Sequence, residues 1–222
     1  ISAWLGILGF PGITAYFSLL ENGKLEKGNT VLVSAAAGAV GSVAGQIAKI
    51  NNCKVIGITG NNKKVNYLTK ELGFTHALNY NNGEISKEIK KIAPEGIDVF
   101  IDNTGGPIAD EVYLNLNLNA RVVLVGNIAQ NNQKIEIQRK DLQNMIMRTR
   151  ATVTGFIVYD FEKRADEARV QITKWIKEGI IKYNETIENG IENAPKALIS
   201  MLRGGNIGKQ LIRLPASIRE NT

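Results

Sequence analysis

Cysteine and histidine are nearly absent from this sequence of 222 residues, which contains one of each, Cys53 and His76. A disulfide needs two cysteines, and a zinc site usually takes about three or four Cys or His ligands. These residues supply neither, so we expect no metal site. Because so low a cysteine content is typical of a reducing compartment, we expect a cytoplasmic protein.

Long apolar runs are also absent, although hydrophobic residues make up 44% of the sequence. No run approaches the roughly 18 apolar residues of a membrane span, so we expect no membrane segment. The first ten residues, ISAWLGILGF, lack an initiator methionine and the basic region that begins a signal peptide. We expect an interior segment here, and therefore a chain that is a fragment.

Charge is not concentrated in any one region. The net charge of +6 comes from lysines spread over several predicted helices rather than from one basic stripe. This distribution favours a solvated basic surface over nucleic-acid binding.

What the sequence does contain is a glycine turn between a strand and a helix. Residues 30–34, TVLVS, form an apolar run typical of a strand buried on both faces, and apolar residues recur at helical spacing from Val40 onward. A helix that starts at such a turn presents unpaired N–H groups and its positive dipole end, which suit a pyrophosphate. The spacing Ala36-x-Gly38-x-x-Gly41 has alanine at the first position of G-x-G-x-x-G, and it predicts dinucleotide binding. A purely structural turn is the alternative.

The loop after the second predicted strand, residues 54–59, indicates which dinucleotide is bound. An NAD site of this type places an acidic residue about 20 residues past the glycines, where it holds the ribose 2′-hydroxyl. The loop at residues 60–64, GNNKK, has no acid and ends in Lys63 and Lys64. This pattern favours NADP(H), whose 2′-phosphate needs cations, and the alternative is that both lysines simply face water.

Strands and helices alternate along the remaining chain, which predicts an α/β fold with a doubly wound parallel sheet, the Rossmann fold. In the strand order 3-2-1-4-5-6, the strands that end at Ser34 and Asp102 are neighbours at the switch point where ligands bind. Asn103 is then either a cofactor contact or a plain turn residue.

The periodicity of the sequence predicts the limits of the individual elements. We expect strands at 30–34, 54–59, 77–80, 97–102, 121–125, 151–158 and 209–214. We expect helices from Pro11, from Val40, and at 65–72, 84–92, 141–149, 165–178 and 194–203.

The long helix at 165–178 is amphipathic, and its spacing predicts that Val170, Trp175 and Ile176 pack in the core. The chain divides into a lead-in helical segment at 1–29, a dinucleotide-binding domain at 30–190, and a C-terminal helix and strand at 191–222.

Six segments resemble a known family when they are taken together and in order. They are PGITAYF, AAAGAVGSVAGQIAK, ELGFTHALNY, IDNTGG, TGFIV and GGNIGKQL. They resemble the zinc-free branch of the medium-chain dehydrogenase/reductase superfamily, and within it the NADPH-dependent double-bond reductases, such as prostaglandin, leukotriene and curcumin reductases. The resemblance covers nearly the whole chain. It implies an enzyme in which NADPH passes a hydride to the β-carbon of an enone or enal.

The resemblance also implies residue roles along the whole dinucleotide, from the 2′-phosphate end through the pyrophosphate turn to the nicotinamide and its carboxamide. The implied cofactor contacts are, in chain order, Gly38, Ala39, Val40, Gly41, Lys64, Tyr80, Asn103, Val125, Gly126, Asn127, Ile128, Asn131, Phe156, Ile157, Val158 and Asn206. Tyr159, just beyond the carboxamide segment, is a candidate to lie near the substrate, and a plain surface tyrosine is the alternative.

Two departures from the family pattern matter. Asn131 stands where tyrosine is common, so an aromatic or hydroxyl contact is lost. Family members also begin with a GroES-like domain of about 100 residues, an ordinary size for a small domain. This sequence has no counterpart to it, so we expect the cofactor-binding portion with flanking remnants of that catalytic domain. The family further implies a homodimer, with 151–158 as the candidate edge strand, because an exposed edge needs a partner.

The same sequence features also fit other classes of protein. The segment 159–163 fits the Y-x-x-x-K pair of short-chain dehydrogenases, but 35–46 lacks the G-x-x-x-G-x-G turn of those enzymes, so we reject that assignment. A methyltransferase would share the sheet and glycine turn but would usually need an acid after the second strand. The alternative that stays open is a non-catalytic NADP-binding module, either a redox sensor or a structural protein.

Overall fold

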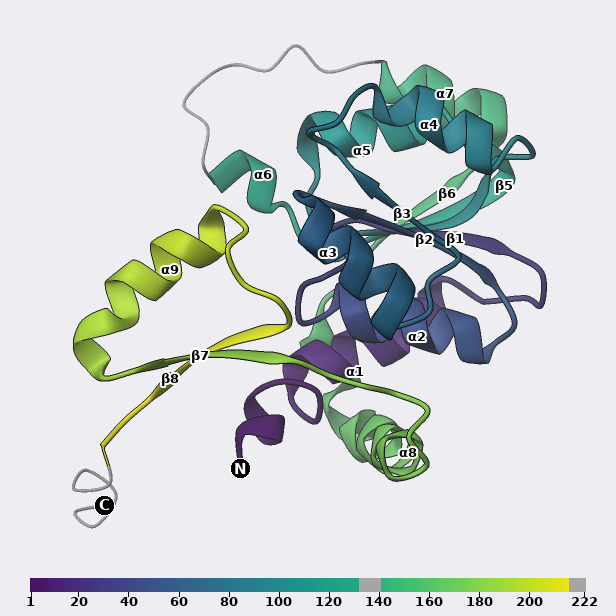
Figure 1. The fold of residues 1–222 in the computed structure, drawn as a ribbon. Coiled ribbons are helices and arrows are strands. Elements are labelled where there is room, and N and C mark those ends of the chain that lie inside the picture. The colour runs from purple at the N-terminus through teal and green to yellow at the C-terminus, as the bar shows by residue number, and fades with distance from the viewer. Residues whose placement is uncertain (132–140, 216–222) are drawn as a thin grey trace.

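A six-stranded parallel sheet forms the centre of this computed structural model, which describes residues 1–131 and 141–215 (Figure 1). The strand order is β3-β2-β1-β4-β5-β6, as the sequence predicts, and each neighbouring pair runs parallel. The strands are β1 Thr30–Val33, β2 Lys54–Thr59, β3 His76–Asn79, β4 Ile97–Asp102, β5 Leu116–Leu124 and β6 Thr152–Gly155.

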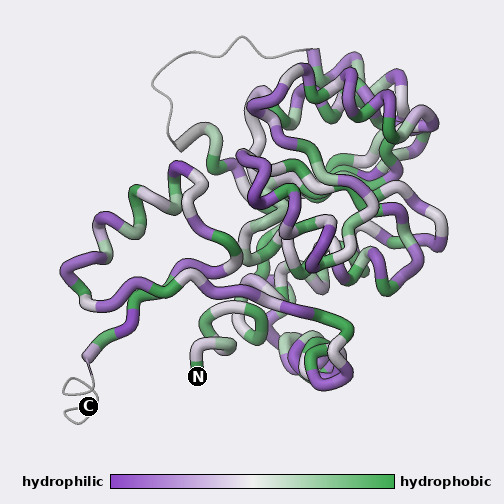
Figure 2. Tube along the Cα trace, in the orientation of Figure 1, coloured by the Kyte–Doolittle hydropathy of each residue, from purple (hydrophilic) through white to green (hydrophobic). Residues whose placement is uncertain are grey.

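Helices cover both faces of this sheet, and each face has its own hydrophobic core. Val31 and Val33 of β1 belong to the cluster that α1, α2 and α8 cover, whereas Leu32 belongs to the cluster under α4, α5 and α7. Because successive side chains of a strand point to opposite faces, a strand between two cores must be apolar throughout. Green, the hydrophobic end of the scale, accordingly runs along much of the trace at the centre of the molecule in Figure 2. The helices are α1 Phe10–Phe17, α2 Gly41–Ile50, α3 Asn62–Asn66, α4 Ile85–Ile92, α5 Gly106–Tyr113, α6 Ile128–Asn131, α7 Leu142–Thr149 and α8 Ala165–Lys177, with π-helical extensions of α1 at Ser18–Asn22 and of α3 at Tyr67–Glu71, and 3-10 helices at Ser2–Leu5 and Val158–Arg164.

A smaller unit follows α8 at the C-terminal end. Strands β7 (Glu185–Asn189) and β8 (Lys209–Arg213) pair in parallel, and α9 (Ala194–Leu202) connects them. In Figure 1 this unit lies to the left of the six-stranded sheet. It touches the glycine turn through an isolated parallel bridge between Gly38 and Gly208. The domain boundary that we placed after residue 190 falls between these two paired strands, and it stays a prediction.

Several expectations about individual elements were wrong. Val170 is 71% exposed, because Ala165, Ala168 and Ile172 form the buried stripe of α8 and Val170 lies on the opposite side of the helix. Trp175 and Ile176 do pack, partly buried, against the core.

Other differences concern element limits. Helix α5 and strand β7 were not predicted, β5 begins five residues before the expected 121, and β6 is confined to Thr152–Gly155. Within the described part of the chain, no helix has both the length and the apolar character needed to cross a bilayer.

Candidate dinucleotide site

The glycine turn lies between β1 and α2, as predicted, and its backbone is tightly packed. Ala35 takes a left-handed conformation, with φ of 46°, directly after the strand. A Cβ on Gly41 would lie 2.6 Å from the carbonyl oxygen of Ala35 and 2.8 Å from the Cα of Ala36, so only glycine fits there without a backbone shift.

This packing leaves donors at the start of α2. The backbone N–H groups of Val40 and Gly41 have no hydrogen-bond partner among the described residues. Unpaired N–H groups at the positive end of a helix form a seat for an anion.

The carboxyl ends of β1 and β4 meet beside this turn in a network of hydrogen bonds. Oδ1 of Asp102 accepts from the Ser34 hydroxyl at 3.0 Å and from the backbone N–H groups of Thr104 at 3.0 Å and Gly105 at 2.9 Å. Asp102 is 2% exposed and Ser34 is fully buried. A buried carboxylate needs such donors, and here they fix the switch point between the two strands. Sequence reasoning named both residues only as strand ends; an acid as the last residue of a buried apolar strand was the available signal for the network.

Asn103 belongs to the same network. Its backbone N–H donates to the Ser34 hydroxyl at 2.9 Å, and its side-chain amide donates to the Ser34 carbonyl oxygen at 2.8 Å. One of its two amide N–H groups is therefore engaged by the protein, and the cofactor contact predicted for Asn103 is left to the other N–H or to the side-chain oxygen.

The loop after β5 packs on this turn. The N–H groups of Val125 and Gly126 donate to the carbonyl oxygen of Asp102 at 2.8 and 3.1 Å. Asn127 lies so close to Gly105 that a Cβ on that glycine would overlap its side chain. Ile128 begins α6, of which Asn131 is the last residue. The side chain of Asn131 lies outside the described part of the structure.

Lys64 occupies an unusual place for a lysine. It lies in α3, which Asn61 caps by accepting from the backbone N–H of Lys64 at 2.9 Å, and its residue surface is only 8% exposed. Its neighbour Lys63 is exposed, so the alternative in which both lysines face water fails for Lys64.

The ammonium of Lys64 forms neither a hydrogen bond nor an ion pair with any described residue. Burial lowers its pKa below the ordinary 10.5 because the charged form loses hydration. Nearby, the Tyr80 hydroxyl would lie 2.7 Å from a Cβ on Gly60, so the tyrosine ring covers the same loop.

The segment that follows β6 lies beside the end of β5. The backbone N–H of Phe156 donates to the Leu124 carbonyl oxygen at 3.0 Å, while its ring stacks on Phe161 at a centroid distance of 5.3 Å. Ile157 is exposed and Val158 is half-buried, so the two residues after the buried Phe156 lie at the surface.

Tyr159 lies further out. It is 64% exposed and meets Phe10 edge-on at a centroid distance of 5.3 Å. Together with Val158 and Arg169 these residues line a cavity of about 290 Å³.

Asn206 reaches the site from the C-terminal unit. Its side-chain amide donates to the Gly208 carbonyl oxygen at 2.8 Å, and the Gly208 N–H donates to the Ala37 carbonyl oxygen at 2.8 Å. The structure thus gathers Gly38 to Gly41, Asn103, the 125–128 loop and Asn206 at the carboxyl edge of the sheet.

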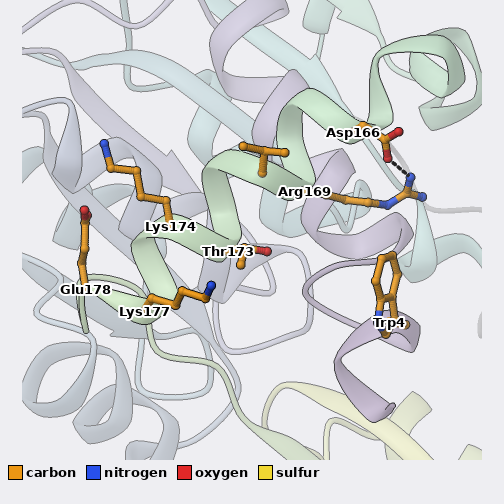
Figure 3. Close-up of a pocket in the computed structure, with 8 residues that line it drawn as sticks. Trp4, Asp166, Arg169, Thr173, Lys174, Lys177 and Glu178 are labelled. Atoms are coloured by element: carbon orange, nitrogen blue, oxygen red, sulfur yellow. Dashed lines mark hydrogen bonds and ion pairs between the residues drawn. The ribbon is translucent and has the colours of Figure 1, made fainter.

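A larger cavity, of about 760 Å³, lies elsewhere, along the outer face of α8 (Figure 3). Arg169 of α8 pairs with Asp166 at 2.8 Å and lies over the ring of Trp4. Lys174 and Lys177 point in different directions in Figure 3, so the polar groups of this open groove do not converge on one point. The strand ends of a doubly wound sheet, where ligands bind, lie away from it.

The fold and the site geometry define a dinucleotide-binding domain of the Rossmann type. Residues 39–174 match the model of the zinc-binding dehydrogenase family, and the chain belongs to that family.

Among sequence relatives, the chain is 45% identical to YfmJ of Bacillus subtilis (strain 168), named as an NADP-dependent oxidoreductase, over 96% of this chain and 64% of that protein. It is 39% identical to prostaglandin reductase 1 of Bos taurus, over 96% of this chain and 65% of the relative. The chain therefore spans less than two thirds of the length of these relatives.

Among solved structures, CurA from Vibrio vulnificus in complex with NADPH superposes with a TM-score of 0.92 at 37% identity, over 96% of this chain and 65% of that one. The resemblance to the reductase group that the six segments indicated is confirmed by these relatives.

Proposed function

We propose that this chain is the NADP(H)-binding portion of a zinc-independent oxidoreductase that reduces the carbon–carbon double bond of α,β-unsaturated ketones or aldehydes. The observation that carries the proposal is the place of Lys64 in α3, shortly after β2: the residue is 8% exposed, and its ammonium has no hydrogen-bond or ion-pair partner among the described residues. Burial of the side chain disfavours its charged form, and a 2′-phosphate bound beside the ammonium offsets that cost. The loop that Lys64 follows has no acid that would repel such a phosphate.

The other contacts are those that the family resemblance implies, and the geometry of the strand ends supports them. The glycine turn from Gly38 to Gly41 receives the pyrophosphate at the free N–H groups of Val40 and Gly41, and Tyr80 and Asn206 lie toward the 2′-phosphate and pyrophosphate ends. The 125–128 loop and Asn131 line the nicotinamide half, where the backbone from Phe156 to Val158 meets the carboxamide.

When bound, NADPH would supply a hydride for the β-carbon of the substrate, and a proton would complete the saturated product. The residues of this chain would hold the nicotinamide, exclude water and orient the substrate, and this chemistry does not call for a metal ion. Tyr159 is the residue of this chain that we place closest to the substrate, since it lines the cavity beside Val158. The protein acts in the cytoplasm as a homodimer, in which β6, a terminal strand of the sheet, provides the exposed edge.

Nucleotide titration tests the cofactor assignment. NADPH and NADH are each titrated into the wild-type protein and the Lys64→Ala variant, with the exposed Lys63→Ala as matched control. The wild type prefers NADPH, and Lys64→Ala loses about ten- to hundredfold in NADPH affinity, the range for a lost charge-assisted contact. Lys63→Ala stays near wild type. Equal binding of both nucleotides by the wild type would contradict the assignment.

The reaction is tested on the full-length product of the reading frame that encodes this chain. Absorbance of NADPH should fall when an enone or enal is added, and the product should be the saturated carbonyl compound. NADPH binding without turnover of any such substrate would instead support the non-catalytic NADP-binding module.

A further inference from the structure

The loop at residues 204–208, between α9 and β8, connects the two ends of the candidate site. A Cβ on Gly204 would lie 3.9 Å from Nζ of Lys64, and Gly208 is bridged to Gly38 of the glycine turn. Figure 1 shows this yellow segment returning to the six-stranded sheet after α9. Whatever fixes the loop therefore also fixes Asn206 relative to both phosphate-binding elements.

One threonine side chain holds the loop from the β7 side. The Thr186 hydroxyl donates to the Ile207 carbonyl oxygen at 2.9 Å and accepts from the Ile207 backbone N–H at 3.1 Å. A single hydroxyl thus satisfies both backbone groups of the residue next to Asn206. The Ile207 side chain packs, partly buried, against the main core.

Thr186 is itself held relative to helix α2, whose start receives the pyrophosphate. Gln46 of α2 is 4% exposed, and its side chain both accepts from the Lys182 N–H at 2.9 Å and donates to the Lys182 carbonyl oxygen at 2.8 Å. Lys182 lies three residues before β7 begins at Glu185. Gln46 thus fixes the segment just before β7 to α2, and the chain continues from Lys182 through Glu185 to Thr186.

We propose that Thr186 is a positioning residue for the dinucleotide, acting through Ile207 to hold Asn206 over the glycine turn. This inference rests on the proposed NADP(H) binding. Without the hydroxyl, the N–H and C=O of Ile207 lose their partner and the loop leaves its position. The phosphate-binding groups of α2 and α3 are unaffected by that loss, so the change appears in affinity rather than in the fold.

A double-mutant cycle on the full-length protein tests this coupling. NADPH affinity is measured for Thr186→Val, Asn206→Ala and their combination, with Thr186→Ser retaining the hydroxyl. We expect Thr186→Val to bind NADPH about tenfold more weakly and Thr186→Ser to bind like wild type. In the Asn206→Ala background, Thr186→Val should add less than about twofold, because two residues that act as a unit are not additive.

Controls separate a positioning role from a general loss of structure. Thr149, whose hydroxyl donates to the Met145 carbonyl oxygen at 2.8 Å in α7, is the matched control, and Thr149→Val should leave NADPH affinity unchanged. Exchange of the Ile207 amide hydrogen should be faster in Thr186→Val than in wild type while the thermal midpoint stays within a few degrees. Thr186→Ala is the second variant if the valine does not fold.

The outcomes are distinct. Wild-type NADPH affinity in Thr186→Val, or losses that add fully with Asn206→Ala, would overturn the positioning role alone. A wild-type protein that does not bind NADPH would overturn the proposed function and this inference with it.

Discussion

Two sites at the carboxyl edge of the sheet differ in whether their charged side chains have partners within the protein. Between β1 and β4, the carboxylate of Asp102 is buried and accepts hydrogen bonds from Ser34, Thr104 and Gly105. In α3, shortly after β2, Lys64 is only 8% exposed, but its ammonium has no partner among the described residues. The first site is complete within the protein, whereas the second is left for a ligand to complete. This contrast distinguishes Asp102, which stabilises the fold, from Lys64, which we propose binds the cofactor.

Removing the carboxylate of Asp102 should give the largest effect on stability. In Asp102→Ala, the hydroxyls of Ser34 and Thr104 and the backbone N–H groups of Thr104 and Gly105 lose their acceptor, which we expect to lower the free energy of unfolding by about 3–5 kcal/mol. Asp102→Asn retains the Oδ1 acceptor and should cost clearly less. Urea unfolding of both variants measures the difference. Equal stability of Asp102→Ala and wild type would mean that the network does not hold the switch point.

The pH dependence of the preference for NADPH over NADH tests the proposed role of Lys64. The pKa of Lys64 in the nucleotide-free protein is lowered by burial, so the ammonium loses its proton below the ordinary value of 10.5. The preference for NADPH over NADH should therefore fall as the pH rises from neutral through that lowered pKa, because a neutral amine no longer attracts the phosphate. Affinity ratios measured across this range check the expectation. In Lys64→Met the ratio should not vary with pH over the same interval, and a ratio in wild type that is equally flat would contradict the account.

The lowered pKa of Lys64 also affects the stability of the nucleotide-free protein. Lysine in the unfolded chain keeps its ordinary pKa and binds its proton more tightly than the folded protein does. The cost of burying Lys64 is thus fully present at neutral pH and disappears as the pH rises through the lowered pKa toward the unfolded value.

The fold was predictable where one periodicity dominates the sequence. Continuous apolar runs such as 30–34 and 97–102 predicted buried parallel strands, and the glycine turn fixed the order of strand and helix around it. Strand β7 was missed because ETIEN alternates weakly and its residues are only half-buried or exposed. Helix α5 was missed because Gly105 and Gly106 suggested a turn, although both glycines have positive φ and simply precede or begin the helix.

Only those parts of the site that are formed by residues close together in the sequence were predictable. Residues 38–41 and Lys64 follow from spacing, but the burial of Lys64 and the exposure of Lys63 depend on how α3 packs. Tertiary contacts between distant segments, such as the one between Gly38 and Gly208, leave no pattern in a single sequence. The resemblance to a family located Asn206, and it gave no indication of Thr186.

The most direct test of the central claim compares thermal unfolding of wild type and Lys64→Met, with and without saturating NADPH. Without nucleotide, the variant should melt about 2–4 °C higher, the shift that about 1 kcal/mol of relieved burial cost produces in a protein of this size. With NADPH the order should reverse, because the wild type binds the nucleotide more tightly and is therefore stabilised more at the same NADPH concentration. If the same protein had the higher melting temperature both with and without NADPH, Lys64 would be an ordinary structural lysine and not the partner of a bound phosphate.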